Sequence, residues 1–152
     1  SIHSYLAEYA QSYISIFRDN VDIVNSLDIN FLTRFRNISA DTVALVFSYP
    51  RYPSEMQKII EALYEKKIDI IGLTNSQMSP IVPFCKYVLI TPQKYLVPTE
   101  PIASVVTMIH ALTVGIYKAD PIGAMEKLKQ YEQAVASNAV FELKNYNFAQ
   151  QL

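Results

Sequence analysis

The sequence predicts an α/β fold, a three-layer sandwich in which a parallel sheet lies between helices. The main observation is a series of short, β-forming apolar runs that suit strands covered on both faces. A second observation is that segments of helical periodicity alternate with these runs through short links, which implies right-handed crossovers and parallel strands. The three apolar runs cover residues 43–47, 70–73 and 87–90.

Length and composition fit one ordinary domain. The chain has 152 residues, of which 51% are hydrophobic and 18% charged, so it can build a core and is not expected to be disordered. A net charge of −1 argues against a strongly basic nucleic-acid-binding domain. One cysteine excludes an internal disulfide and fits a cytoplasmic protein. The longest apolar stretch, 102–117, is shorter than the ~20 residues of a membrane-spanning helix, so we expect no membrane partner.

Four elements are expected in the first 50 residues. Apolar residues at helical spacing predict helices over 4–18 and 29–38. A short apolar run at 21–24 predicts a small strand between them. The run at 43–47 then predicts the first buried strand.

Prolines divide the next part of the chain. Pro53 and Glu55 suit the first turn of a helix that ends near Lys67. Strands at 70–73 and 87–90 follow, and three prolines mark the loop after the second of them.

The remainder is predicted to be helical. The helix at 102–117 is apolar nearly all round, so it should be buried in the domain or against a second copy of the chain. Asp120 and Pro121 are typical of an N-cap and a first helical residue. We assign residues 1–136 to the domain and 137–152 to a tail of uncertain structure.

Three short sequences between residues 41 and 92 are more specific than these patterns. They are DTVALVFSY at 41–49, IDIIGLTNS at 68–76, and Ser79-Pro80 followed by YVLITP at 87–92. Together they resemble the sugar isomerase (SIS) domain of RpiR-type bacterial transcriptional regulators. The first resembles the strand that leads into that family's serine-rich phosphate loop, and the second resembles the next strand and its Thr-Asn-Ser end.

The resemblance implies a flavodoxin-like sheet and a regulatory function. In such regulators the SIS domain binds a sugar phosphate and forms a homodimer, while a separate N-terminal helix-turn-helix domain binds DNA. It implies no cofactor, metal or catalytic residue. The family's first strand and its Gly-x-Gly-x-Ser turn should precede the helix at 4–18. We therefore expect that strand to be lacking here, with Ser1 as the last serine of the turn and 140–148 as another candidate for the strand.

Polar residues follow the first two buried runs. Parallel sheets bind ligands beyond the carboxyl ends of their strands, where hydroxyls, backbone N–H groups and helix N-termini face a phosphate together. Ser48 closes the first run, and its alternative role is a turn or a helix cap. Thr74, Asn75 and Ser76 close the second, where Asn75 equally suits a cap of the next short segment.

The loop after Ser48 departs from the family pattern Ser-x-Ser-Gly-x-Thr. Here residues 48–53 read SYPRYP, so two prolines remove backbone donors and the lost glycine limits positive φ. Arg51 would compensate by a bidentate contact with phosphate, or it is simply solvated. Tyr49 and Tyr52 stack on a sugar ring or pack over the loop. The candidate ligand-binding residues are thus Ser1, Ser48, Tyr49, Arg51, Thr74, Asn75 and Ser76.

Two other functions stay open. A phosphosugar isomerase would need Glu100 or His110 as an acid–base group in the crevice, since His3 lies at the start of the chain. We expect His110 instead to be a core or interface residue. The other alternative is a dimerisation module whose ligand site has decayed. Cys85 has no partner of redox or zinc spacing, which predicts an inert thiol.

Overall fold

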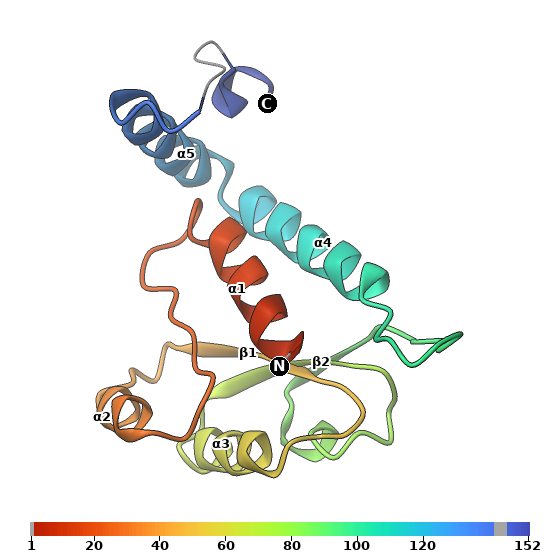
Figure 1. Ribbon diagram of the computed structural model, residues 1–152. Coiled ribbons are helices and arrows are strands. Elements are labelled where there is room, and N and C mark those ends of the chain that lie inside the picture. The colour runs from red at the N-terminus through yellow and green to blue at the C-terminus, as the bar shows by residue number, and fades with distance from the viewer. Residues whose placement is uncertain (1, 142–145) are drawn as a thin grey trace. The chain divides into compact units, whose positions relative to one another are not determined.

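The computed structural model describes residues 2–141 and 146–152, and it divides into two compact units. Unit 1 holds the residues up to Ala7 together with Ile23–Met108. Unit 2 holds Glu8–Asp22 and the chain from Ile109 onward. Figure 1 shows the elements of both units in chain order.

The core of unit 1 is a three-stranded sheet whose strands are all parallel. β1 (Val43–Ser48) pairs with β2 (Asp69–Thr74), and β2 pairs with β3 (Tyr87–Ile90). The last residues of the three strands are in register, with Ser48 opposite Thr74 and Thr74 opposite Ile90. The strands predicted at 43–47, 70–73 and 87–90 and their parallel arrangement are therefore confirmed.

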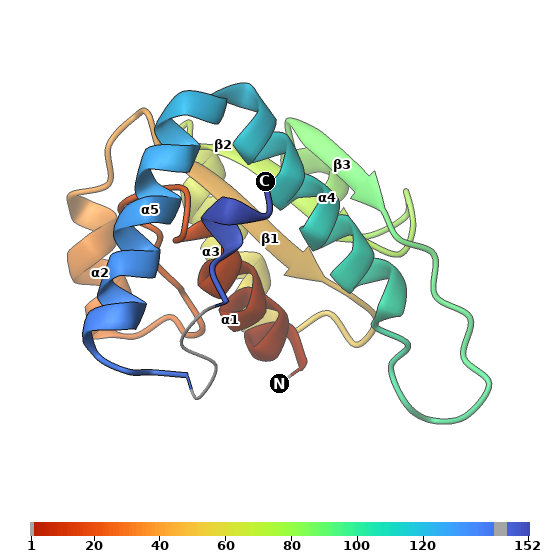
Figure 2. The same cartoon turned by 90° about the horizontal axis from the view of Figure 1, so that it is seen from above.

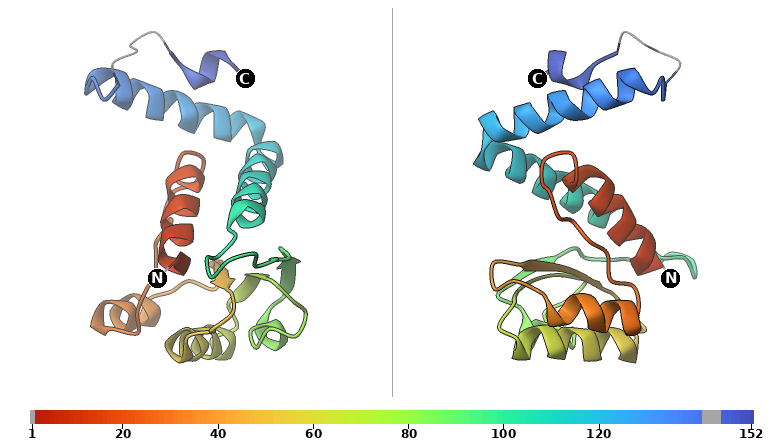
Figure 3. Two further views of the ribbon diagram at one scale, coloured as in Figure 1. Left: turned by 45° about the vertical axis from the view of Figure 1, so that its right-hand side comes forward. Right: turned by 90° about the vertical axis from the view of Figure 1, so that its left-hand side faces the viewer.

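Helices cover both faces of this sheet, which confirms the three-layer α/β prediction (Figure 3). α2 (Ile29–Arg36) and α3 (Ser54–Glu65) lie on one face. The first turns of α1 (Ile2–Ile14) and α4 (Ala103–Ala119), which belong to the same unit, lie on the other.

Side chains alternate between the two faces along each strand. Val46 and Ile70 join one buried cluster with apolar residues of α2 and α3, which are Phe31, Ile59, Ile60 and Leu63. Phe47 and Leu73 are opposite each other in register and are also buried, but they lie outside that cluster. Burial of both strand faces explains why these runs are apolar throughout instead of alternating.

Polar contacts fix the ends of α2. Asp28 is its N-cap, and its carboxylate accepts from the Phe31 backbone N–H (2.8 Å) and the Ser26 hydroxyl (2.7 Å). These hydrogen bonds hold the pKa of Asp28 below its usual value. At the other end, the Lys66 ammonium donates to the backbone carbonyls of Phe35 and Arg36.

Unit 2 contains α5 (Pro121–Ser137) and the short 3-10 helix η2 (Phe148–Gln150) beside it (Figure 2). Asp120 caps α5 by accepting from the Gly123 backbone N–H (3.0 Å), which confirms the predicted cap and proline start. The buried Glu132 carboxylate accepts from the Phe148 backbone N–H (2.9 Å) and so anchors the tail to α5. Among the described residues, no helix has the length and apolar character to cross a membrane.

Two predictions about elements were wrong. Residues 21–24 form no strand, because no strand among the described residues pairs with them, and the Val21 carbonyl accepts from the Gln11 side chain (2.7 Å) instead. The first helix ends at Ile14 rather than at residue 18. The candidate strand at 140–148 falls largely on residues 142–145, which lie outside the described residues, so it stays a prediction.

The predicted burial of the helix at 102–117 holds for one side only. Within α4, Val105, Ile109 and Thr113 form a buried stripe at a spacing of four residues. Val114 is 38% exposed and His110 is exposed, so the chain alone does not cover this helix on all sides. Burial against a second copy stays a prediction.

Gly72 provides a test of the packing between β2 and η1 (Val82–Phe84). A Cβ atom at Gly72 would lie 2.6 Å from the Cys85 sulfur and 2.9 Å from Ile81 Cδ1. We expect Gly72→Ala to lower the free energy of unfolding by about 1–3 kcal/mol, and by less in a Cys85→Ala background, in urea denaturation.

The matched control is Gly115→Ala in α4, where a Cβ meets no atom within 4 Å. This change should stabilise the protein by about 0.5–1 kcal/mol, because alanine favours a helix more than glycine does. A Gly72→Ala protein as stable as the wild type would contradict the packing described here.

Candidate functional site

The carboxyl ends of β1, β2 and β3 form one edge of the sheet, here called the carboxyl edge. Ser48 and Thr74 are the last residues of β1 and β2, and Thr91 directly follows β3. All three residues are buried, with exposed fractions of 2%, 0% and 2%. The Thr91 backbone N–H donates to the Thr74 carbonyl (2.8 Å), which continues the ladder by one residue. The register thus brings three hydroxyl-bearing residues to the same edge.

Tyr49 links the two outer strands at this edge. Its side chain is 1% exposed, and its hydroxyl is hydrogen-bonded to Thr91 Oγ1 (2.5 Å). Burial raises the pKa of Tyr49, and the bond to Thr91 offsets this only in part, so the phenol is neutral at physiological pH. The ring is packed within the edge, which agrees with the second of the two roles considered for Tyr49, packing of the loop.

The loop after Tyr49 forms a tight turn with Arg51 in a strained conformation. The Tyr52 backbone N–H donates to the Tyr49 carbonyl (3.1 Å), with Pro50 and Arg51 between them. Arg51 has φ of 76°, as expected at the third position of a type II turn, where glycine is favoured. The expectation that losing the family's glycine limits positive φ at this position is therefore wrong. Arg51 itself is exposed.

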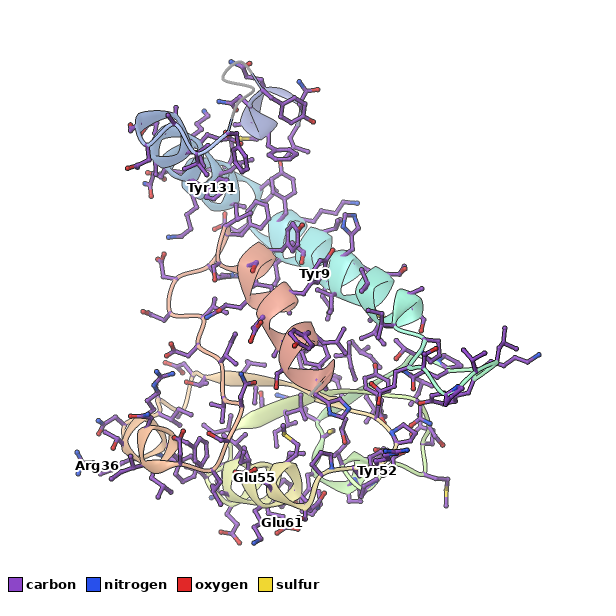
Figure 4. The ribbon with its side chains drawn as sticks, viewed as in Figure 1. Tyr9, Arg36, Tyr52, Glu55, Glu61 and Tyr131 are labelled. Carbon is purple, nitrogen blue, oxygen red and sulfur yellow. The ribbon has the colours of Figure 1, made fainter. Side chains whose placement is uncertain are left out.

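A side-chain bond connects this loop to the end of β2. The hydroxyl of Tyr52, a residue labelled in Figure 4, donates to Asn75 Oδ1 (2.9 Å). Asn75 thus joins β2 to the loop between β1 and α3. Ser76 Oγ accepts from the Met78 backbone N–H (3.1 Å), which shapes the turn after β2. Asn75 and Ser76 are only partly buried.

His3 is a residue of this region that sequence reasoning set aside. It is 9% exposed and its ring stacks on Tyr49, with ring centroids 6.1 Å apart and planes 12° apart. Its Nε2 atom is buried and has no hydrogen-bond partner among the described residues. Burial lowers the pKa of His3, and the Glu100 carboxylate opposes that shift. The available signal was helical spacing, because His3 precedes the buried Leu6 by three residues.

A family model now identifies the domain that carries this edge. The SIS domain model matches residues 3–115, which include all three strands and the loop. The chain belongs to the SIS domain family. Among curated proteins, no sequence matches it.

Solved structures show the same fold at low sequence identity. The SIS domain of an RpiR transcription factor from Sphaerobacter thermophilus has a TM-score of 0.78 and 14% identity, over 86% of this chain and 73% of that one. NanR of Vibrio vulnificus, solved with ManNAc-6P, has a TM-score of 0.68 and 15% identity, over 89% of this chain and 52% of the NanR chain. A putative sugar-phosphate isomerase from Listeria monocytogenes has a TM-score of 0.64 and 14% identity, over 78% of this chain and 65% of that one. This SIS domain thus spans about half of the NanR chain.

The remaining candidates of this SIS domain are placed as follows. Ser1 lies outside the described residues. His110 is exposed on α4, so it is not a core residue of the single chain, and its expected place at an interface stays a prediction. Glu100 is exposed in the loop after β3. Cys85 donates to the Ile81 carbonyl (3.3 Å), and burial raises the pKa of its thiol, as expected for an unreactive cysteine. In the part of the chain that is described, no three His, Cys, Asp or Glu residues are grouped for a metal ion.

The strain at Arg51 gives a stability test. A residue with a Cβ is disfavoured at positive φ, whereas glycine is not. We expect Arg51→Gly to raise the free energy of unfolding by about 0.5–1 kcal/mol in urea denaturation. Arg51→Ala removes the same side chain but keeps the Cβ, so it should give no such gain. A glycine variant no more stable than the alanine variant would contradict the turn described here.

Proposed function

We propose that this SIS domain binds a sugar phosphate at its carboxyl edge and is the effector-binding and dimerisation domain of an RpiR-type transcriptional regulator. The observation that carries the proposal is the register that aligns Ser48 with Thr74 at one edge of a parallel sheet. In open α/β sheets, ligands bind beyond the carboxyl ends of the strands. The domain would act in the bacterial cytoplasm and catalyse nothing.

The phosphate would lie between the hydroxyls of the edge and the start of α3. α3 begins at Ser54, directly after the loop, and a helix N-terminus favours an anion. Pro50 and Pro53 lack backbone N–H groups, so this loop offers fewer donors than the family pattern. The exposed guanidinium of Arg51 offsets that loss by a charge-assisted contact.

The other candidate residues have supporting roles in this proposal. Thr74 adds a second hydroxyl, and Asn75 and Ser76 line the side of the site next to β2. Tyr49 forms the buried base of the edge through its bond to Thr91. Ser1 would belong to the glycine turn that the family places before α1.

The structural neighbours support the regulatory class. One is the SIS domain of an RpiR transcription factor, and NanR was solved with the sugar phosphate ManNAc-6P. By this analogy, DNA would be bound by a separate helix-turn-helix domain, and a homodimer would couple the two. Such coupling requires that the ligand bind two arrangements of the dimer with different affinity.

A phosphosugar isomerase is the second candidate. His3 and Glu100 lie in the same unit, and the Glu100 carboxylate opposes the lowering of the His3 pKa, so an imidazole and a carboxylate would be the candidate groups for proton transfer. Conversion of an aldose phosphate to a ketose phosphate by the purified protein would support this reading over the regulatory one.

The direct test is binding of a panel of hexose 6-phosphates and N-acetylhexosamine 6-phosphates, ManNAc-6P included, followed by thermal unfolding. A ligand at one hundred times its Kd should stabilise the protein by about 2.7 kcal/mol. Ser48→Ala should weaken the binding of the best ligand about 10-fold or more, since a hydrogen bond to a charged phosphate is lost.

Ser39→Ala is the matched control, because Ser39 is an exposed serine in the turn before β1, at the opposite end of that strand. Its affinity should equal that of the wild type. No stabilisation by any panel member would contradict ligand sensing and favour a dimerisation module without a ligand site. Equal losses in both serine variants would contradict the placement at the carboxyl edge.

A further inference from the structure

We propose that His3 is a ligand-binding residue whose Nε2 atom hydrogen-bonds a sugar hydroxyl of the bound phosphosugar. This inference rests on the proposed function and extends it to the sugar end of the ligand. The starting observation is that Nε2 is buried without a partner among the described residues. Buried polar groups in native proteins are nearly always paired, so an unpaired one needs an explanation.

The surroundings of His3 place it at the carboxyl edge. Its ring stacks on Tyr49, which directly follows Ser48 and is fixed by its hydroxyl bond to Thr91. Because the His3 ring stacks on Tyr49 and Tyr49 is itself hydrogen-bonded to Thr91, the His3 side chain has little rotational freedom. The imidazole is therefore held ready at the edge, as a binding group must be if it is not to lose entropy on binding.

The charge state of the ring suits a neutral partner. Burial lowers the pKa of His3 and Glu100 only partly opposes this, so the ring is neutral near pH 7. A neutral imidazole has one donor and one acceptor nitrogen. A sugar hydroxyl both donates and accepts, so it pairs with Nε2 in either tautomer. A phosphate is bound better by Arg51, whose guanidinium is charged.

The test is His3→Phe, which keeps a flat ring to stack on Tyr49 and removes both nitrogens. The ligand-free variant should melt at the same or a higher temperature than the wild type, because an unpaired buried nitrogen is lost. Its Kd for ManNAc-6P, or for the panel member that stabilises the wild type most, should rise about 10-fold by calorimetry. Its affinity for inorganic phosphate should stay unchanged.

Two further variants sharpen this test. His3→Gln carries an amide near the position of Nε2 and should recover part of the sugar phosphate affinity. Tyr5→Phe is the control in the same helix, since the Tyr5 side chain is 68% exposed, and it should change neither binding nor melting temperature.

Each other outcome overturns the proposal. A lower melting temperature of ligand-free His3→Phe would show that Nε2 has a partner in the protein. An equal loss for inorganic phosphate would place the contact at the phosphate instead. Wild-type affinity of His3→Phe for the sugar phosphate would overturn this inference alone, whereas a wild type that binds no panel member would overturn the proposed function as well.

Discussion

The in-register, parallel pairing of β1, β2 and β3 is the constraint on which the rest of unit 1 depends. It aligns Ser48, Thr74 and Ile90, so the residues that follow the strands emerge at one edge. A slip of one residue would turn the side chains of a strand to the opposite face. Ile70 would then leave the cluster under α3, and the hydroxyls would no longer share an edge.

The carboxyl edge is held by side chains where the family pattern uses glycine and backbone donors. Tyr49 is hydrogen-bonded to Thr91 after β3, and Tyr52 to Asn75 after β2, so both ends of the turn are tied to the ends of other strands. These two bonds explain how Arg51 is kept at positive φ in spite of its Cβ. Arg51 thus lies exposed between two tyrosines whose side chains are fixed by hydrogen bonds.

The sequence was a good guide wherever a pattern had one physical explanation. Continuous β-forming runs predicted the three buried strands, and Asp120-Pro121 predicted the start of α5. The run at 21–24 was misleading, because a strand also needs a partner, and in the described part of the chain none pairs with it. His110 has apolar neighbours in sequence but lies off the stripe of Val105 and Ile109, so it is exposed. His3 was set aside for its position near residue 1, although its spacing from Leu6 marks a buried helix face. The positive φ of Arg51 depends on contacts of Tyr49 and Tyr52 that no local pattern reveals.

Backbone amide chemical shifts, followed by NMR during a titration with ManNAc-6P or the best-binding hexose phosphate, test the location of the site most directly. The largest shifts are expected at the carboxyl ends of β1 and β2, in the turn around Arg51 and in the first turn of α3. Shifts concentrated instead at the opposite strand ends, around residues 41–43 and 67–69, would contradict the account.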